Sequence, residues 1–320
     1  MRPLLTSEGS FPRMATDLHD AIRSAVAFQI AHGLELLTDG EQRGDMLSMY
    51  EGLPGITADR GIPRFTGRVL PVDDPARFVK LQDLVFVRGA FPDRAFRVNL
   101  TAPTTFAFAC GSSGAGPAYR GATDPALHDD LTEAIRPLAR EVGRKGVHLQ
   151  IDDPILSQGM RDFGPALRRL DAIAGEVPRD RVSVHVCGSL ARGKALEALL
   201  RLENVSVLNL AFAGRLERSN VALLDPRPWA DRDLSLGAGC AHLQVTRAEE
   251  VMSAESVGRL LKEIAGRMGW ERVRYVLPDC GFRGTPPEFV GPILDGLQGG
   301  FERAYSGGPA DPGEQARPPR

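Results

Sequence analysis

Short apolar runs rich in β-branched residues alternate with segments of helical period along most of the chain. These runs predict strands, and the seven clearest are residues 35–38, 96–100, 147–151, 182–186, 205–210, 234–236 and 273–277. We expect an eighth strand in the less regular stretch between residues 61 and 90. Eight strand-helix units in a chain of 320 residues favour α/β structure and a single (β/α)8 TIM barrel over a doubly wound sheet.

Helix-end signals mark some of the connecting segments. Asp124 and the following proline predict the start of a helix that reaches about Arg144, with Gly146 just past its end. Thr246 and Glu249 have the spacing of a capping box, which predicts another helix beginning at Thr246. The last residues are glycine, proline and charge, so we expect a barrel over residues 1–305 and a disordered tail over 306–320.

Composition narrows the classes of function. The chain is 42% hydrophobic and 25% charged, as is usual for a folded globular protein, and its formal net charge is −2. Such a balance argues against nucleic acid or an anionic membrane as partner and favours small molecules. No run approaches the roughly 20 apolar residues of a membrane span, and no signal peptide is evident, so we expect a cytoplasmic protein with reduced cysteines. Glycine-rich nucleotide-binding motifs do not follow any predicted strand.

Polar residues end several of the predicted strands, where a barrel places its active site. His185 and Cys187 are two residues apart on one strand and face the same side, and Cys280 ends a later strand. One imidazole and two thiolates favour Zn²⁺, and three protein ligands leave a fourth position for a substrate. The alternative for each cysteine alone is a small buried hydrophobic residue.

These strand ends carry six motifs that together resemble the catalytic carboxyl-terminal barrel of cobalamin-independent methionine synthases, within the superfamily that includes uroporphyrinogen decarboxylase. The resemblance covers about residues 9 to 281. Its motifs are Gly-Ser-Phe-Pro-Arg at 9–13, Asp-Gly-Glu-Gln-Arg-Gly-Asp-Met at 39–46, Gln-Ile-Asp-Asp-Pro at 150–154, His-Val-Cys-Gly at 185–188, Gly-Ala-Gly at 237–239 and Pro-Asp-Cys-Gly at 278–281.

The resemblance implies a role for each matching residue. His185, Cys187 and Cys280 match the zinc ligands of the family. Glu41 and Asp152 match carboxylates that hold the substrate ammonium group, and a helix N-cap or a salt bridge to an arginine of the barrel is the structural alternative for both. Ser10 matches the residue that meets the amino-acid carboxylate, with a turn-forming hydroxyl as its alternative. The implied substrate is the small thiol homocysteine.

Two departures from the family pattern concern the metal and the methyl donor. Ala211 occupies the position of the usual fourth zinc ligand, a glutamate, so zinc has either three protein ligands, which we favour, or a fourth from Glu217 or Cys240. Gln244 occupies the position of a histidine that protonates folate in folate-using members. His242, two residues earlier, is the candidate catalytic acid if the strand register differs, and otherwise a structural histidine.

We therefore expect a zinc-dependent homocysteine methyltransferase. Because the protonating histidine is replaced and the sequence holds one barrel where folate users have two, methylcobalamin on a corrinoid protein is the expected donor rather than methylfolate. A methyl group on cobalt leaves without a proton, whereas one on the folate nitrogen requires an acid. The alternatives are another zinc-thiolate alkyl transfer or lyase reaction of the superfamily, and a non-catalytic barrel that binds zinc or a thiol.

Overall fold

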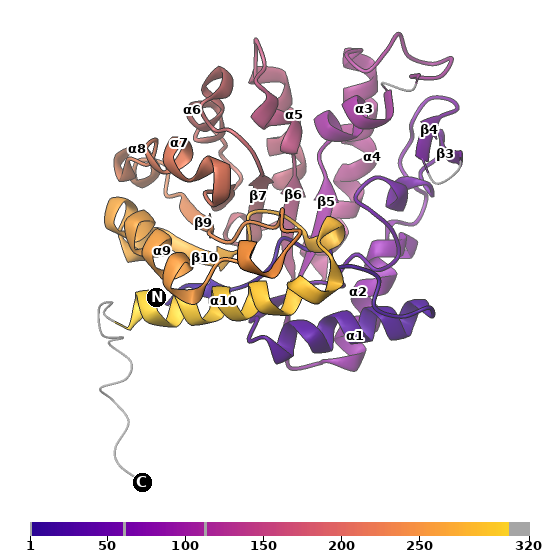
Figure 1. Cartoon of the computed structure of the whole chain (residues 1–320). Coiled ribbons are helices and arrows are strands. Elements are labelled where there is room, and N and C mark those ends of the chain that lie inside the picture. Colours follow the sequence, from indigo (N-terminus) through magenta and orange to yellow (C-terminus); the bar gives the residue numbers. More distant parts are fainter. Residues whose placement is uncertain (1, 60–61, 112–113, 307–320) are drawn as a thin grey trace.

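The computed structural model describes residues 2–59, 62–111 and 114–306, which form a barrel of parallel strands surrounded by helices (Figure 1). The eight-stranded sheet has the order β1-β10-β9-β8-β7-β6-β5-β2. A parallel bridge between Thr6 and Leu36 joins the chain just after β1 to β2, so the two edge strands of this order meet. The predicted (β/α)8 barrel is therefore confirmed.

The strands of the barrel are short and end at the same edge. They are β1 Leu4–Leu5, β2 Leu36–Leu37, β5 Ala95–Thr101, β6 His148–Asp152, β7 Val182–Val186, β8 Val207–Ala211, β9 Ser235–Gly239 and β10 Val273–Leu277. A separate antiparallel hairpin pairs β3 Ile56–Asp59 with β4 Ile62–Phe65.

Helices connect the strands on the outside of the barrel (Figure 1). The α-helices of the described residues are α1 Leu18–Ala31, α2 Val79–Ala90, α3 Pro103–Gly111, α4 Pro125–Arg144, α5 Gly164–Ala174, α6 Ala195–Leu199, α7 Glu217–Val221, α8 Pro226–Ala230, α9 Ala254–Met268 and α10 Pro287–Tyr305.

The eighth strand of the barrel is not where the sequence pattern predicted it. It is β1, only two residues long, near the amino terminus. The stretch expected to hold it, residues 61–90, instead contributes β4 of the hairpin and helix α2. A two-residue strand has no measurable alternation, which explains why the prediction was wrong.

Of the two predicted helix starts, one is confirmed and one is wrong. The Asp124 side chain caps α4 by accepting from the Ala126 amide, and α4 ends at Arg144 as predicted. The helix expected from Thr246 begins eight residues later at Ala254, capped by Ser253. Thr246 instead donates through its amide and hydroxyl to Glu250, which folds this segment into a local turn. Most of the predicted tail, residues 307–320, lies outside the described residues.

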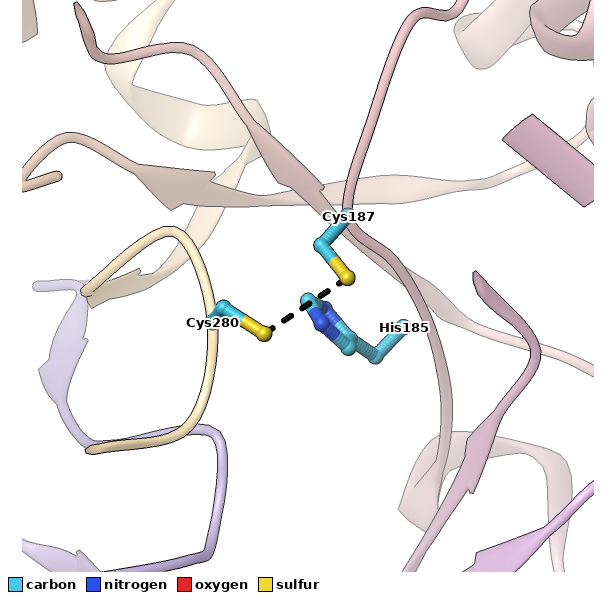
Figure 2. Close-up of side chains that lie close together, drawn as sticks. All are labelled: His185, Cys187 and Cys280. Carbon is cyan, nitrogen blue, oxygen red and sulfur yellow. Dashed lines mark hydrogen bonds between the residues drawn. The ribbon is translucent and has the colours of Figure 1, made fainter. Parts of the chain in front are cut away.

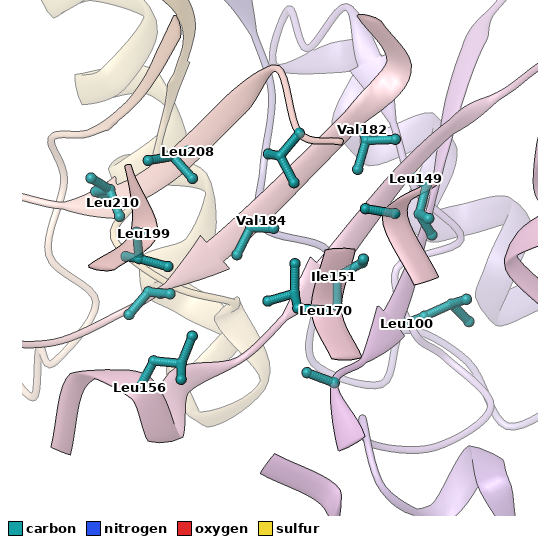
Figure 3. Packing of buried hydrophobic residues seen from close by; sticks show 14 of the residues in the cluster. Leu100, Leu149, Ile151, Leu156, Leu170, Val182, Val184, Leu199, Leu208 and Leu210 are labelled. Atoms are coloured by element: carbon teal, nitrogen blue, oxygen red, sulfur yellow. The ribbon is translucent and has the colours of Figure 1, made fainter. Parts of the chain in front are cut away.

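The strands of the barrel alternate apolar residues that face the helices with polar residues that face the barrel axis. Figure 3 shows part of the apolar layer, in which strand residues of β6, β7 and β8 pack near residues of α5 and α6: Leu149, Ile151, Val182, Val184, Leu208, Leu210, Leu170 and Leu199. The intervening positions carry the inward polar side chains Gln150, Asp152, Ser183, His185 and Asn209, all of them buried. Burial of the outward layer stabilises the barrel, whereas the inward layer is available for chemistry.

Within the described ranges, the helices are too short or too polar to cross a membrane.

Candidate metal and substrate site

Three potential metal ligands meet at the carboxyl edge of the barrel. His185 lies on β7 and Cys187 follows two residues later, while Cys280 lies in the loop after β10. The three side chains point toward one another in Figure 2, and their ligand atoms all lie within 4.8 Å of one another. The structure therefore brings together the residues that the sequence predicted as metal ligands.

Gly188 fixes how the chain leaves this group of ligands. Its φ of 153° is one that residues with a side chain rarely adopt, and a Cβ at this position would lie 2.2 Å from Ser157 Oγ. The Ser157 hydroxyl also donates to the carbonyl oxygen of Cys187 at 3.3 Å. The glycine thus permits the close approach that anchors the Cys187 backbone.

The three residues fit a bound Zn²⁺. The sulfurs of Cys187 and Cys280 are 3.5 Å apart, too far for a disulfide bond. Two sulfurs each about 2.3 Å from a tetrahedral zinc would be about 3.8 Å apart, close to what is observed. Nε2 of His185 is buried without a hydrogen bond, which is costly unless a further group binds there.

The protonation of the site also favours a cation. Burial lowers the pKa of His185, but the Glu8 carboxylate and Cys187 raise it well above the usual value. The hydrogen bond between the two sulfurs lowers the pKa of Cys280 to about 4 and raises that of Cys187, so the sulfurs share one proton. A metal cation would replace the protons of this group and leave imidazole and thiolate ligands.

A cavity of about 270 Å³ opens beside the ligands and contains all the predicted substrate residues. Besides the three metal ligands it is lined by Glu8, Ser10, Glu41, Asp45, Met46, Asp152, Pro154, Gly281 and Arg283. We refer to it as the acceptor cavity. Its carboxylates make it suited to a cationic group on a small molecule.

Glu41 belongs to a buried charged cluster at one wall of the acceptor cavity. Its backbone φ of 51° turns the chain after β2, and its Oε1 lies 3.6 Å from the ammonium group of Lys80. Lys80 is itself buried and closer to Asp39, at 3.2 Å. Burial raises the pKa of Glu41 to about 7, while Lys80 acts in the opposite direction. Glu41 therefore has an ion pair, with a lysine and not with the arginine of the structural alternative, and the same residue still lines the cavity.

Asp152 ends β6 and also lines the acceptor cavity. Its two oxygens accept from Gln150 Nε2 at 2.7 Å and from Asn99 Nδ2 at 3.2 Å. Burial raises the pKa of Asp152 to about 6. Amide donors hold the carboxylate in one orientation, so it is positioned before a ligand arrives.

Ser10 lies where its chain segment meets the loop of Cys280. A Cβ on Gly281 would lie 2.1 Å from Ser10 Oγ, and the Phe282 amide donates to the Ser10 carbonyl at 2.7 Å. The serine is therefore beside the metal ligands and in the wall of the acceptor cavity.

A second cavity, of about 480 Å³, opens on the other side of Cys187 and Cys280. In addition to these two cysteines, its lining consists of Gly188, Ala211, Ala213, Gly214, Arg215, Leu216, His242, Leu243, Gln244 and Asp279. We refer to it as the open cavity. His242 and Gln244 both border it, so the candidate acid lies outside the acceptor cavity but beside the same two sulfurs.

The structure does not place a fourth protein ligand with the other three. Ala211 borders the open cavity where the glutamate of the resembling family would stand. Among the described residues, neither Glu217 nor Cys240 is part of the group of ligand atoms. Cys240 is fully buried, and burial raises the pKa of its thiol. Three protein ligands remain the arrangement that the geometry supports.

Sequence reasoning missed two buried charged residues, Glu8 and Lys80. Glu8 Oε1 lies 3.1 Å from Nδ1 of His185, and Lys80 joins the Glu41 cluster from helix α2. Glu8 stands directly before the Gly-Ser-Phe-Pro-Arg motif, so its position was a usable signal. Lys80 lies in an amphipathic helix, where a lysine ordinarily faces solvent and carries no such signal.

Fold and site together define a (β/α)8 barrel that carries an imidazole-dithiolate group and a carboxylate-lined cavity at its carboxyl edge. The pattern of the family described as cobalamin-independent synthase, catalytic domain, matches residues 126–295. The chain belongs to this family.

Curated relatives agree. The chain is 33% identical to a methionine synthase of Methanothermobacter marburgensis over 276 residues, covering 84% of each chain. It is 32% identical to a methionine synthase of Methanothermobacter thermautotrophicus over 295 residues, covering 88% of this chain and 87% of the relative.

Solved structures show the same fold. A B12-independent methionine synthase from Shewanella, in complex with selenomethionine, superposes with a TM-score of 0.77 at 17% identity, covering 96% of this chain and 98% of that one. A protein from Listeria monocytogenes described as a putative vitamin-B12 independent methionine synthase gives 0.69 at 18% identity, covering 94% and 98%.

The resemblance seen in the sequence motifs is thus confirmed, but one expectation drawn from the departures is not supported. The family description is cobalamin-independent, which conflicts with methylcobalamin as donor and with a corrinoid protein as partner. That expectation rested on Gln244 and on the single barrel in the sequence, and Gln244 is a weak basis because His242 borders the same cavity.

Proposed function

We propose that this protein transfers a methyl group to the thiol of homocysteine and so forms methionine, with zinc bound by His185, Cys187 and Cys280. The observation that carries the proposal is the junction of this group of ligands with the acceptor cavity, in a chain of this family. A thiol that reaches the metal from this cavity would have its amino-acid end among carboxylates. The methionine synthases among the relatives support the same reaction.

The acceptor cavity would recognise an amino acid through its ammonium group. Glu41 and Asp152 supply two buried carboxylates, and charge-assisted hydrogen bonds to them are stronger than neutral ones. Ser10 offers a neutral donor toward the substrate carboxylate from the loop side of the cavity. These three residues bind and orient the acceptor, which contributes to catalysis by holding the thiol in one place.

When bound, zinc would supply Lewis-acid stabilisation of the substrate thiol as thiolate at neutral pH, well below an ordinary thiol pKa of about 8.5. Because the chain supplies three ligands and not four, one coordination position would remain for the substrate thiol. His185 is almost completely enclosed by the barrel, whereas the two cysteines are partly exposed and border both cavities, from which a thiol could reach the remaining position.

The methyl donor would enter through the open cavity. This cavity reaches the same two sulfurs from the other side, which allows donor and acceptor to be bound at once. His242 is the titratable imidazole in its wall and would donate the proton that an amine leaving group requires. With a methyl group on cobalt no such proton would be needed, so the two donor chemistries make different demands on this residue.

The test is methionine formation by the zinc-loaded protein from homocysteine, measured by mass spectrometry with methyltetrahydrofolate and methylcobalamin as separate donors. Methionine from either donor, abolished in Cys280→Ala, supports methyl transfer, and the productive donor identifies the chemistry. Loss of the methyltetrahydrofolate reaction in His242→Ala would assign the proton to His242. Absence of methionine with both donors, in protein that binds zinc and homocysteine, would overturn the proposed reaction.

A further inference from the structure

Glu8 is a buried carboxylate that no role described so far requires. It follows β1 inside the barrel and is 4% exposed. Its Oε1 lies 3.1 Å from Nδ1 of His185, and both side chains are almost completely enclosed. This oxygen has no hydrogen bond among the described residues, so the imidazole is the polar group that it faces. A buried carboxylate is costly unless a cation compensates it, and the contact with His185 supplies that compensation.

Amide groups of the inward polar layer fix the other parts of Glu8. Gln150 Nε2 donates to Glu8 Oε2 at 2.8 Å, and Asn99 Nδ2 donates to the Glu8 carbonyl at 2.6 Å. Gln150 is oriented in turn by Asn209, whose Nδ2 donates to Gln150 Oε1 at 2.7 Å. Asn209 itself fits because its neighbour on β9 is Gly237, where a Cβ would lie 2.0 Å from the Asn209 oxygen. The carboxylate is therefore held by Gln150, and residues of two further strands fix the Glu8 backbone and Gln150 itself.

Glu8 is placed to act on a metal ligand and not as a ligand itself. The ligand atoms of His185, Cys187 and Cys280 form one group within 4.8 Å, and Glu8 is not a member of it. The contact with Nδ1 leaves Nε2 of His185 as the nitrogen for the metal. A carboxylate on the second ring nitrogen fixes the tautomer and raises the basicity of a metal-binding histidine.

We propose that Glu8 is a positioning residue that orients His185 for metal binding through Nε2, and that Gln150 links it to the acceptor cavity. Gln150 Nε2 donates both to Glu8 and to Asp152 Oδ1, so one amide group joins the partner of the metal ligand to the proposed ammonium-binding carboxylate. The inference rests on the proposed zinc site. It goes beyond that site because it assigns a role to a residue outside the group of ligands.

The experiment measures zinc affinity by competition with a chromophoric chelator in Glu8→Gln and Glu8→Leu. The glutamine keeps an acceptor near His185 but removes the charge, whereas the leucine removes both. We expect zinc affinity about tenfold weaker in Glu8→Gln and approaching a hundredfold weaker in Glu8→Leu, with one zinc per chain still reached at saturation. Absorption of the Co²⁺-loaded variants should keep its thiolate charge-transfer bands and show shifted ligand-field bands.

Glu176→Gln is the matched control. Glu176 is also mostly enclosed and charge-paired, with Arg136 and Arg140, but it lines neither cavity. This variant should lower the free energy of unfolding of the metal-free protein without changing zinc affinity. Thermal unfolding of all variants separates a general loss of stability from a specific loss of metal binding, and Glu8→Gln decides the question if Glu8→Leu does not fold.

Unchanged zinc affinity and an unchanged cobalt spectrum in folded Glu8→Gln and Glu8→Leu would overturn the role of Glu8 while leaving the zinc site intact. Failure of the unmodified protein to bind zinc or cobalt would instead overturn the proposed site, and the role of Glu8 with it. Loss of metal from Cys280→Ala in the same assay shows that the competition reports on this site.

Discussion

The two cavities that meet at Cys187 and Cys280 differ in size and in charge. The acceptor cavity has about 270 Å³ and is lined by Glu8, Glu41, Asp152 and other polar groups. The open cavity has about 480 Å³ and is lined largely by small and apolar residues, with Arg215 and His242 as its basic side chains. One pair of sulfurs thus separates a smaller space bordered by several carboxylates from a larger one whose lining includes basic side chains.

The difference suits the two cavities to different tasks: the acceptor cavity to binding the amino acid, and the open cavity to entry of the methyl donor. Carboxylates in the acceptor cavity are fixed by amide and ammonium partners, so the cost of ordering them is met during folding. In the open cavity Asp279 is likewise held, by the Phe212 and Ala213 amides, but the larger volume can admit a larger reactant. A preorganised site for the small amino acid beside a larger space for the methyl donor is what transfer between two bound molecules requires.

The largest effect should come from replacing Cys187 and Cys280, which line both cavities. The double substitution Cys187→Ala, Cys280→Ala leaves one imidazole, so the zinc content should fall from about one per chain to almost none. Metal analysis of purified protein after removal of loosely bound ions measures this. Full zinc content in the double variant would show that the metal binds elsewhere, and would contradict a metal site between the two cavities.

The acceptor cavity is tested next by Glu41→Gln and Asp152→Asn. Each removes one charge near the proposed ammonium group, and loss of a charge-assisted hydrogen bond costs about 1.5 to 3 kcal/mol, or roughly ten- to hundredfold in affinity. Calorimetric binding of homocysteine and of methionine should show this loss, while zinc content stays unchanged. If both variants bind these amino acids as the parent does, the ammonium group is not held here.

The pH dependence of methionine binding should show a smaller effect. Burial raises the pKa of Glu41 to about 7, so this carboxylate becomes protonated and loses its charge as the pH falls through 7. Loss of charge from a carboxylate with this pKa should weaken methionine binding about tenfold at pH 6 relative to pH 8. Methionine is the suitable ligand because it has no thiol that titrates. Glu41→Gln should reduce the change to about twofold, the part left by Asp152, whose pKa burial raises to about 6, and a profile that is unchanged in this variant would contradict the assignment.

The smallest effect is expected on methionine affinity when a residue of the open cavity is replaced. His242→Ala should leave methionine affinity within about twofold of the parent, because the imidazole lines the other side of the sulfurs. The same variant should raise the KM of a donor that uses the open cavity. A loss of methionine affinity as large as that in Glu41→Gln would show that the two cavities do not act separately.

Sequence reasoning identified the group of potential metal ligands because strand alternation is strict. His185 and Cys187 had to face one side, and the loop after β10 brings Cys280 to the same edge. The barrel was predictable for the same reason, since most of its strands have at least five residues and repeat one pattern. The two-residue strand β1 carries no such pattern, and only its pairing with β10 and β2 reveals it.

The buried charges around the site were beyond the reach of sequence patterns. Lys80 meets Glu41 across 39 positions of sequence, and Glu8 meets His185 across a still longer separation. Such contacts follow from closure of the barrel and not from local periodicity. The methyl donor expected from Gln244 was not supported for a related reason. Residue identity at one position of a motif does not say which other side chain, here His242, borders the same space.

X-ray absorption at the zinc edge tests the central claim most directly, because it counts the sulfur ligands with and without homocysteine. The structure predicts two sulfurs at about 2.3 Å and one imidazole nitrogen at about 2.0 Å in the zinc-loaded protein, and a third sulfur after homocysteine is added. The same measurement with methionine should show no third thiolate sulfur. Four protein ligands before addition and an unchanged sulfur count after it would contradict an open metal position, and with it the proposed transfer to a bound thiol.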